Sequence, residues 1–435
     1  MKYKRYPSYK DSGVEWLGEI PTTWNLKPFW SLYRRQKRTG YPSETLLSVY
    51  RDFGVVRKSS RDDNNNNKAS EDLSGYQIVY PSDVAMNKMK AWQGSLGVSK
   101  YQGIVSPAYF VFESLHNHYD AYLHHLMRSP RYIAGYLRMS KGIRVNQWDL
   151  DPQYHSRMQI TLPSYDEQKS IATYLDKATT KIDTLIEKQT KLIELLKEKR
   201  QAVISSAVTR GLDASVPMKD SGVEWLGEIP EGWSSGRLKQ VSKRIIVGIA
   251  EAATHAYADE GVPILRATNI RKGKIIGKML YLTKSFANSS ERQTKKIKKN
   301  DLVTVRTGNA GVTAIASEEF DGSHCFTMLV TTLQKSQLSK FFEYLVGSNA
   351  ATSYFILEGW GTAQVNISVP ILQNLPISLP SFKEQSNIVN YLNTQTSKID
   401  NLISKSTQGI VLLKEKRTAL ISAAVTGKID VRDAA

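Results

Sequence analysis

The sequence is poor in the features that mark secreted and membrane-embedded proteins. It contains one cysteine, Cys325, so no disulfide can form within the chain. No apolar run approaches the ~18 residues that a membrane-spanning helix needs, and the first residues, MKYKRYPSYK, lack the apolar stretch of a signal peptide. These absences predict a reducing, cytoplasmic setting and no membrane contact.

Motifs of catalysis and metal binding are also missing. The chain has no Pro-Pro pair, so it lacks the Asn-Pro-Pro-aromatic type of motif with which an adenine methyltransferase holds a flipped base. The glycines and lysine of Gly94–Lys100 lack P-loop spacing. Adjacent residues on a strand point to opposite faces, so we expect Cys325 to be a buried thiol rather than a nucleophile paired with His324. Helix-start polarity and packing are favoured over a zinc site for the cluster of His116, His118, His124 and His125.

What the sequence does have is an internal duplication. The twelve residues KDSGVEWLGEIP occur at Lys10–Pro21 and again, unchanged, at Lys219–Pro230. A second block, Leu162–Asp213, aligns without a gap on Leu379–Asp430, with about 30 of 52 positions identical. A chain of 435 residues is also too long for one ordinary core. We interpret it as two copies of one unit, each with a Trp-rich lead-in, a variable segment and a helical block.

Most of the excess positive charge lies in the variable segments. Residues 25–161 hold 19 Lys and Arg against 11 Asp and Glu, and residues 234–378 hold 18 against 10. Each variable segment therefore has a net charge of +8, within a total of +18 for the chain. We call each variable segment a head and the duplicated parts the frame. Basic heads on a nearly neutral frame are typical of a protein that binds a polyanion, although a basic face can also be merely solvated.

The helical blocks carry a heptad-like apolar seam. In the first block, apolar residues spaced alternately four and three apart predict one helix from Glu167 to about Ala207. The second block repeats the pattern, and because the unit between the helices must run out and back, we expect an antiparallel pair. The predicted scaffold positions on the seam are Ile182, Leu185 and Leu196, with Ile399, Leu402 and Leu413 in the second copy.

The variable segments read as mixed α/β domains. Strands are predicted at Tyr76–Tyr80 and Ile104–Glu113, followed by a helix over 121–140 that is interrupted near Pro130. In the second copy, strands are predicted at Asp301–Thr307 and Phe326–Leu333, followed by one helix at Leu338–Leu357.

Several of these motifs resemble those of a known family. The lead-in GVEWLGEIPxxW, the LPxxxEQxxIxxYL opening of each helical block, the LLKEKR run, and SPAYFVFE and KGIRVNQWDL in the first head are similar to the specificity subunit of Type I restriction-modification systems. The resemblance covers essentially the whole chain. It implies a non-catalytic subunit that reads double-stranded DNA and binds no cofactor itself. S-adenosylmethionine would be bound by methyltransferase (modification) subunits, and ATP and Mg by restriction/translocase subunits.

The resemblance also implies an architecture. The expected fold class is α+β, with two mixed α/β target-recognition domains related by pseudo-two-fold symmetry and separated by two long antiparallel coiled-coil helices. Each target-recognition domain would read one half of a bipartite, asymmetric DNA site. The predicted division is 1–161 for the first lead-in and target-recognition domain, 162–213 for the central helix, 214–378 for the second lead-in and domain, and 379–435 for the distal helix.

Direct readout of bases favours Arg, Lys, Asn or Gln on loops, with positive charge around them for phosphates. A structural hydrogen bond is the competing role for each such residue, and Arg57–Lys68 can equally be low-complexity sequence. The DNA-binding candidates are Arg57, Lys58, Lys88, Lys90, Trp92, Gln93, Lys100, Asn146, Gln147, Arg266, Asn269, Arg271, Arg306, Asn309, Gln364 and Asn366.

The repeated lead-in is predicted to be a mounting element rather than a functional site. Its apolar residues suit a contact that pins each head to the helical frame or to a docked partner. They are Trp16, Leu17 and Ile20 in the first copy, and Trp225, Leu226 and Ile229 in the second. Two other functions stay open at this point: an enzyme with an embedded nuclease or methyltransferase activity, and a structural coiled-coil adaptor.

Overall fold

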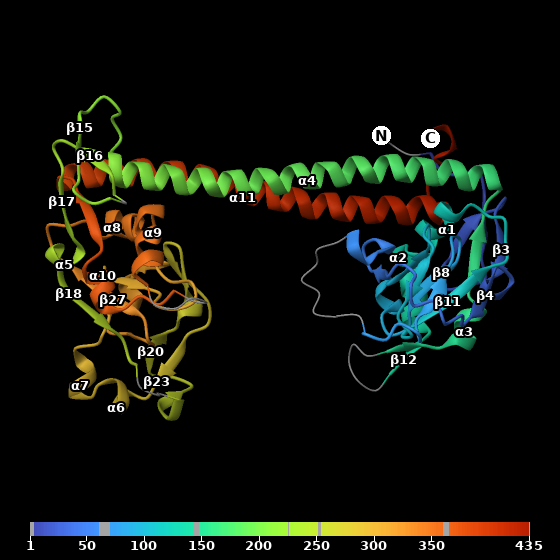
Figure 1. Ribbon diagram of the computed structural model, residues 1–435, viewed down its shortest axis with the longest axis horizontal. Helices are drawn as coiled ribbons and strands as arrows, with labels where there is room; N and C mark the ends of the chain where they lie inside the picture. Colours follow the sequence, from blue (N-terminus) through green and yellow to red (C-terminus); the bar gives the residue numbers. More distant parts are fainter. Residues whose placement is uncertain are drawn as a thin grey trace. The chain divides into compact units, whose positions relative to one another are not determined.

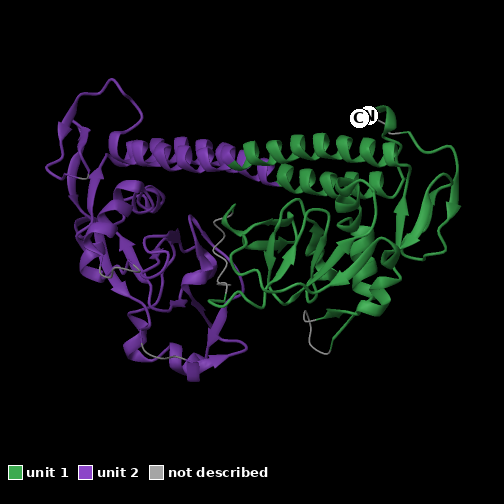
Figure 2. Ribbon diagram, turned by 45° about the vertical axis from the view of Figure 1, so that its right-hand side comes forward, with its two compact units in different colours: residues 1–190, 408–435 green, residues 191–407 purple. Residues whose placement is uncertain are grey.

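A computed structural model describes residues 4–60, 70–142, 148–224, 226–250, 254–359 and 365–434. The chain forms two compact units, the first made of Met1–Thr190 and Gln408–Ala435 and the second of Lys191–Thr407 (Figure 2). Each unit therefore contains one variable segment together with part of both long helices. The boundaries of the units differ from those of the four predicted segments, because each long helix contributes to both units.

The two long helices are α4 (Tyr165–Arg210) and α11 (Phe382–Val425), labelled in Figure 1. Both begin at a serine cap, because the hydroxyl oxygens of Ser164 and Ser381 accept the backbone N–H groups of Glu167 and Glu384, each at 3.3 Å. The helix predicted from Glu167 to about Ala207 is confirmed as part of α4.

The two lead-ins form the same β-hairpin. In the first unit β1 (Tyr9–Asp11) pairs antiparallel with β2 (Glu19–Pro21), and in the second β15 (Met218–Asp220) pairs with β16 (Glu228–Pro230). A further strand pair follows each lead-in and joins the two ends of the variable segment. It is β3 (Asn25–Pro28) with β14 (Gln159–Leu162) in the first unit, and β17 (Ser234–Arg237) with β28 (Pro376–Leu379) in the second.

The variable segments share a four-stranded antiparallel sheet. Its order in the first unit is β4 (Tyr33–Gln36), β11 (Tyr109–Ser114), β8 (Val84–Asn87) and β9 (Leu96–Val98). In the second unit the order is β18 (Ser242–Val247), β27 (Leu329–Leu333), β24 (Leu302–Thr304) and β25 (Thr313–Ile315). The order of the strands along the chain and their pairing are the same in both sheets. The two heads therefore share one sheet topology although their sequences differ.

Two helices follow this sheet in each unit. They are α1 (Asp120–Met127) and α2 (Pro130–Arg138) in the first, and α8 (Ser339–Val346) and α9 (Asn349–Glu358) in the second. The predicted interruption near Pro130 is confirmed. The single helix expected at Leu338–Leu357 is wrong, because Gly347 ends α8 and the Ser348 hydroxyl accepts the N–H of Ala351 to start α9.

The remaining elements are short. In the first unit they are β5 (Leu47–Tyr50), β6 (Gly54–Arg57), β7 (Gln77–Val79), β10 (Gly103–Val105), β12 (Ser140–Lys141), β13 (Asp149–Leu150) and α3 (Pro152–Ser156). In the second unit they are α5 (Leu238–Val241), β19 (Tyr257–Ala258), β20 (Val262–Leu265), β21 (Ile270–Arg271), β22 (Lys274–Ile275), β23 (Leu280–Leu282), α6 (Lys284–Ala287), α7 (Ser290–Gln293), β26 (His324–Cys325) and α10 (Val369–Gln373). Among the described residues, no helix combines the length and the apolar character needed to cross a membrane.

The helix seam departs from the predicted one at one of the predicted positions in each helix. Ile182 and Ile399 are buried, and Leu196 and Leu413 are half-buried, but Leu185 and Leu402 are 41% and 51% exposed. The inward positions next to them are held instead by Ile186 and Ile403. Placing Leu185 and Leu402 in the seam was therefore wrong, because apolar residues occupy both neighbouring positions and the sequence alone does not choose between two heptad phases.

Candidate nucleic-acid interface

In the first head, the turn between β8 and β9 gathers four of the predicted DNA-binding residues: Lys88, Lys90, Trp92 and Gln93. The indole N–H of Trp92 donates to the carbonyl of Met89 at 3.0 Å, and its ring centroid lies 4.9 Å from that of Trp148. The Lys88 ammonium lies 3.9 Å from the Asp149 carboxylate. The turn is thus held against residues 148–150, while Lys90 stays exposed.

The stretch predicted as one loop, Asn87–Lys100, is divided by the buried strand β9. Because β8 and β9 are antiparallel, Lys100 lies at the end of the hairpin opposite the turn. Beside it, the Arg57 guanidinium covers the ring of Tyr101 at 5.2 Å, and Lys58 is half-buried at the end of β6. The candidates of the first head therefore form two groups, one on the turn and one around Tyr101.

In the second head, the equivalent turn joins β24 to β25 and holds Arg306 and Asn309. The Nε of Arg306 donates to the Oδ1 of Asn366 at 3.0 Å, so these two candidates are brought together. Asn309 is exposed at the tip of the turn. The two turns occupy the same place in the shared sheet, yet one carries lysines and tryptophan and the other arginine and asparagine.

The group Arg266, Asn269 and Arg271 holds its own loop together. Asn269 is buried, its amide donates to the carbonyls of Ile276 at 3.0 Å and Lys278 at 3.3 Å, and its Oδ1 accepts the N–H of Arg266. The prediction of Asn269 as a base-contacting residue is therefore corrected, because turn formation uses its amide. Arg271 is exposed but donates to the carbonyls of Thr268 and Ile270.

Four predicted positions lie outside the described residues. They are Asn146, Gln147, Gln364 and Trp225, and the stretch Arg57–Lys68 is described only as far as Ser60.

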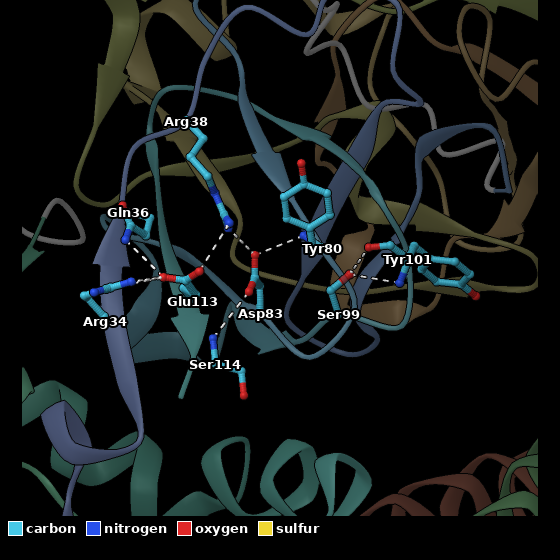
Figure 3. Close-up of polar contacts among 9 residues, drawn as sticks. All are labelled: Arg34, Gln36, Arg38, Tyr80, Asp83, Ser99, Tyr101, Glu113 and Ser114. Carbon is cyan, nitrogen blue, oxygen red and sulfur yellow. Dashed lines mark hydrogen bonds and ion pairs between the residues drawn. The ribbon is translucent and has the colours of Figure 1, made fainter. Parts of the chain in front are cut away.

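A buried aspartate directly precedes the strand that leads into each turn, and the sequence analysis missed it. Asp83 directly precedes β8, its Oδ2 accepts from Arg38 at 2.5 Å and from the N–H of Tyr80 at 3.0 Å, and its side chain is 4% exposed (Figure 3). Burial raises the pKa of Asp83, while the backbone N–H of Tyr80 and the Arg38 charge oppose that rise.

The second head repeats this arrangement residue by residue. Asp301 directly precedes β24, and its Oδ2 accepts from Arg244 at 3.0 Å and from the N–H of Lys298 at 2.9 Å. The residue before each aspartate, Ser82 or Asn300, has a positive φ of 72° or 68°. The only signal in the sequence was a Ser-Asp or Asn-Asp pair before a strand, which is too short to be found without the fold.

Arg38 also connects Asp83 to the neighbouring strands. Its second nitrogen lies 3.8 Å from Glu113, whose Oε2 accepts from Arg34 at 2.8 Å and from Gln36 at 3.0 Å (Figure 3). Hydrogen bonds from Arg34 and Gln36 lower the pKa of Glu113. The network joins β4 and β11 to the start of β8, at the end of the sheet opposite the turn.

The lead-in residues lie in or against the core of their own unit. Leu17, Ile20 and Ile229 are fully buried, and Leu226 is buried. Trp16 is half-buried, with its ring centroid 5.1 Å from that of Tyr132 on α2.

Side chains in the described residues form no group of three or more His, Cys, Asp or Glu arranged to hold a metal ion. Within the histidine cluster, His125 pairs with Asp176 at 2.8 Å. His124 is half-buried and contacts the carbonyl of Val98 and the guanidinium of Arg128. Each therefore has a structural contact.

Comparison with known proteins shows which proteins this chain is similar to. Residues 230–410 match the family model of the Type I restriction modification DNA specificity domain. The chain is 25% identical over 309 residues to the Type I restriction enzyme MjaVIII specificity subunit of Methanocaldococcus jannaschii, an alignment that covers 65% of each protein. The alignment thus spans just under two thirds of that relative. The predicted resemblance to Type I specificity subunits is confirmed.

The fold extends the likeness to nearly the whole chain. A chain from a structural study of complex assembly and conformational transition of the type I R-M system has a TM-score of 0.65 at 16% identity, covering 93% of this chain and 98% of that one. The HsdS subunit from Thermoanaerobacter tengcongensis has a TM-score of 0.55 at 16% identity, covering 96% and 100%. The predicted fold class, with mixed helix-and-strand domains and two long helices, is confirmed.

Proposed function

We propose that this chain is a sequence-specific DNA-binding specificity subunit of a Type I restriction-modification complex, and that each head reads one half of a bipartite, asymmetric DNA site. The observation that carries this proposal is the pair of equivalent turns. The same sheet, with the same buried aspartate–arginine pair at its other end, carries a turn with Lys88 and Trp92 in one head and a turn with Arg306 and Asn309 in the other. The sheet is the same in both heads while the polar side chains of the turns differ. This is expected if each head contacts a different base sequence.

The charge distribution supports nucleic acid as the ligand. Each variable segment has a net charge of +8, while the duplicated parts are nearly neutral. Phosphate neutralisation by Lys and Arg supplies most of the sequence-independent affinity for DNA, so heads of this charge suit a duplex. A structural coiled-coil adaptor would not need charge concentrated in this way.

The partners follow from the same proposal. Methyltransferase subunits dock on the helices, where the identical runs LLKEKR at 195–200 and 412–417 place Leu195 and Leu412 at 50% and 64% exposure. Restriction/translocase subunits join the complex through the methyltransferase. S-adenosylmethionine, ATP and magnesium belong to those partner subunits, and this chain contributes recognition rather than catalysis.

An exchange of heads tests the proposal. Replacing Asn25–Thr161 by the corresponding segment of a related specificity subunit is expected to change one half of the methylated site and leave the other half intact. Sequencing of methylated adenines in cells that carry the chain with its partners gives the readout. Exchange of residues 234–378 is the reciprocal control and changes the other half. If either exchange alters both halves or neither, the two-reader model fails.

The alternative is an enzyme with an embedded nuclease or methyltransferase activity. Incubation of the isolated chain with DNA, S-adenosylmethionine and magnesium tests it. Methyl transfer or cleavage by the chain without partners would replace the proposal with an embedded enzyme.

A further inference from the structure

The second unit contains a cavity of about 880 Å³ between the helices and the head. Its wall is formed by Arg200 on α4 and Asp400 on α11, by Lys272 in the β21–β22 turn, by the β24–β25 turn and by Gly347 after α8. All of these residues belong to the second unit. The cavity is therefore a property of one compact body.

The first unit shows why this space is open. The α1–α2 and α8–α9 junctions correspond, so Arg128 in the first unit stands where Gly347 stands in the second. The Arg128 guanidinium donates to the carbonyl of Arg51 at 2.7 Å and contacts the Nε2 of His124 at 2.8 Å, and so occupies the space beside its own helix pair. Glycine has no side chain to fill the equivalent space.

The backbone does not require glycine at this position. Gly347 has φ −85° and ψ 4°, close to the φ −99° and ψ 3° of Arg128. A Cβ on Gly347 would lie 3.2 Å from the Glu343 carbonyl oxygen, a close contact that a shift of a few tenths of an ångström relieves. The missing side chain is thus not explained by backbone strain.

Cations dominate the wall of the cavity. Arg200 donates through Nε to Asp400 at 2.9 Å, and Lys340 pairs with Glu343, so both wall carboxylates already have partners. The Lys272 ammonium donates to the neutral amide oxygen of Gln201 at 3.3 Å and pairs with no carboxylate among the described residues. Partial burial and the charge of Arg200 lower the pKa of Lys272.

Lys272 therefore places a positive charge beside the Arg200–Asp400 pair that no carboxylate among the described residues neutralises. An anion between Lys272 and Arg200 would relieve their repulsion and satisfy donors at the same time. Amide groups of Asn393 and Asn401 on α11 line the same space and can donate further hydrogen bonds. These groups suit tetrahedral oxygen acceptors, which take several donors at once.

We propose that this cavity binds a phosphate group, with Lys272 and Arg200 as its charged ligands. The phosphate belongs either to the backbone of bound DNA or to a free phosphate or nucleotide, and the DNA source rests on the function proposed above. In the first unit the equivalent position carries the Arg128 side chain in place of a glycine.

Two variants of the full chain test this site. Lys272→Gln removes the cation, and Gly347→Met fills the space with a neutral side chain about as long as that of Arg128. Lys335→Gln is the control for charge, since Lys335 is exposed on the same unit and lies outside the cavity wall. Gly347→Ala is the control for the added Cβ, since it leaves most of the cavity open.

Two probes separate the sources of phosphate. Titration with inorganic phosphate, followed by phosphorus NMR, is expected to show binding that weakens at least tenfold in Lys272→Gln and Gly347→Met but not in the controls. Titration with duplex DNA over a range of salt is expected to give a slope of log affinity against log salt that falls by about 0.9 in Lys272→Gln, the value for one lost phosphate contact.

The two titrations together distinguish the possible outcomes. A change in the duplex slope alone assigns the site to the DNA backbone, and a change in phosphate binding alone assigns it to a free phosphate or nucleotide; both support the site. If neither titration distinguishes the two variants from their controls, the site is overturned. If the unaltered chain fails to bind any duplex, the proposed DNA-reading function fails, while the phosphate titration still decides the cavity.

Discussion

Arg417 on α11 donates through its Nε to both carboxylate oxygens of Asp183 on α4, at 2.9 and 3.2 Å. The alignment of the two helical blocks places Asp183 opposite Asp400 and Arg200 opposite Arg417. In the second unit, Arg200 donates to Asp400 at 2.9 Å. The repeat thus makes the same ion pair twice, and in each unit one partner comes from each copy.

These pairs also give the direction of the helices. From one pair to the other, the α4 residue moves forward along the chain while the α11 residue moves backward, which defines an antiparallel pairing. Arg200 and Arg417 occupy inward positions, with side chains only 20% and 32% exposed. They reach the opposite helix, whereas the lysine before each of them, Lys199 or Lys416, is exposed.

A charge exchange at the first pair is predicted to be tolerated, whereas single changes are not. Asp183→Arg places two guanidinium groups side by side and is expected to cost about 1 kcal/mol, the upper range for a half-exposed pair. The double variant Asp183→Arg with Arg417→Asp should recover most of that loss. Urea unfolding of four chains, namely the unaltered chain, Asp183→Arg, Arg417→Asp and the double variant, gives the coupling energy, with the Arg200–Asp400 pair left intact as the internal reference. Additive losses in the double variant would contradict a direct pairing.

The two copies differ in a buried contact of the first tryptophan after the lead-in. Glu167 on α4 accepts hydrogen bonds from the Tyr6 hydroxyl at 2.7 Å and from the Trp24 indole at 3.0 Å. In the second unit the indole nitrogen of Trp233 is buried without a hydrogen-bond partner among the described residues. Glu384, which aligns with Glu167, does not bond to it.

Glu167→Ala is therefore predicted to destabilise the first unit by about 2 kcal/mol, because it leaves two buried donors unsatisfied. Glu384→Ala is the matched control and should cost much less, since it removes no such acceptor. Limited proteolysis with mass spectrometry over a urea series measures the two units separately. Equal losses in the two variants would show that the Trp24 contact contributes nothing.

The long helices and many strands were predictable, because their signals extend over many residues. The incorrect or missing predictions concern single residues. At Leu185 and Ile186 two adjacent apolar residues allow two heptad phases, and only packing selects Ile186. At Asn269 the same amide suits a base contact or a turn, and its burial decides for the turn. Asp83 and Asp301 became recognisable as equivalents only when the shared sheet aligned them, since their sequence signal is two residues long.

Acid is predicted to destabilise the first unit more than the second. Burial lowers the pKa of His155 to about 3 and that of His116 to about 4, and it also lowers the pKa values of His118 and His124. The second unit has one described histidine with a lowered pKa, His324. An unfolded histidine takes up a proton near pH 6.5, but these folded histidines take it up only at lower pH, so stability is lost as the pH falls below about 6.5.

His155 allows this loss to be measured. Its ring packs among Phe29, Phe112 and Tyr136, and neither ring nitrogen has a partner among the described residues. At pH 5 its contribution to the loss is about 2 kcal/mol relative to pH 7.5. His155→Phe should remove that part of the pH dependence, with urea unfolding at both pH values as the readout. A variant that keeps the full dependence would exclude His155 as the cause.

Docking of methyltransferase subunits is predicted to need the outward leucine of each LLKEKR run. Leu195 and Leu412 are exposed, although the next leucine of each run, Leu196 or Leu413, turns into the helix seam. An exposed leucine at the same place in both copies contributes nothing to the seam, and a protein contact would bury it. Two equivalent leucines suit two copies of one partner.

Leu195→Glu and Leu412→Glu are each expected to lose one methyltransferase subunit from the complex, and the double variant to lose both. A carboxylate at an apolar contact is left desolvated and unpaired, which opposes binding. Lys197→Glu and Lys414→Glu introduce the same acid on the opposite side of each helix and should leave the stoichiometry unchanged. Native mass spectrometry of the co-expressed complex counts the subunits. Full occupancy in the leucine variants would move the docking surface elsewhere on the chain.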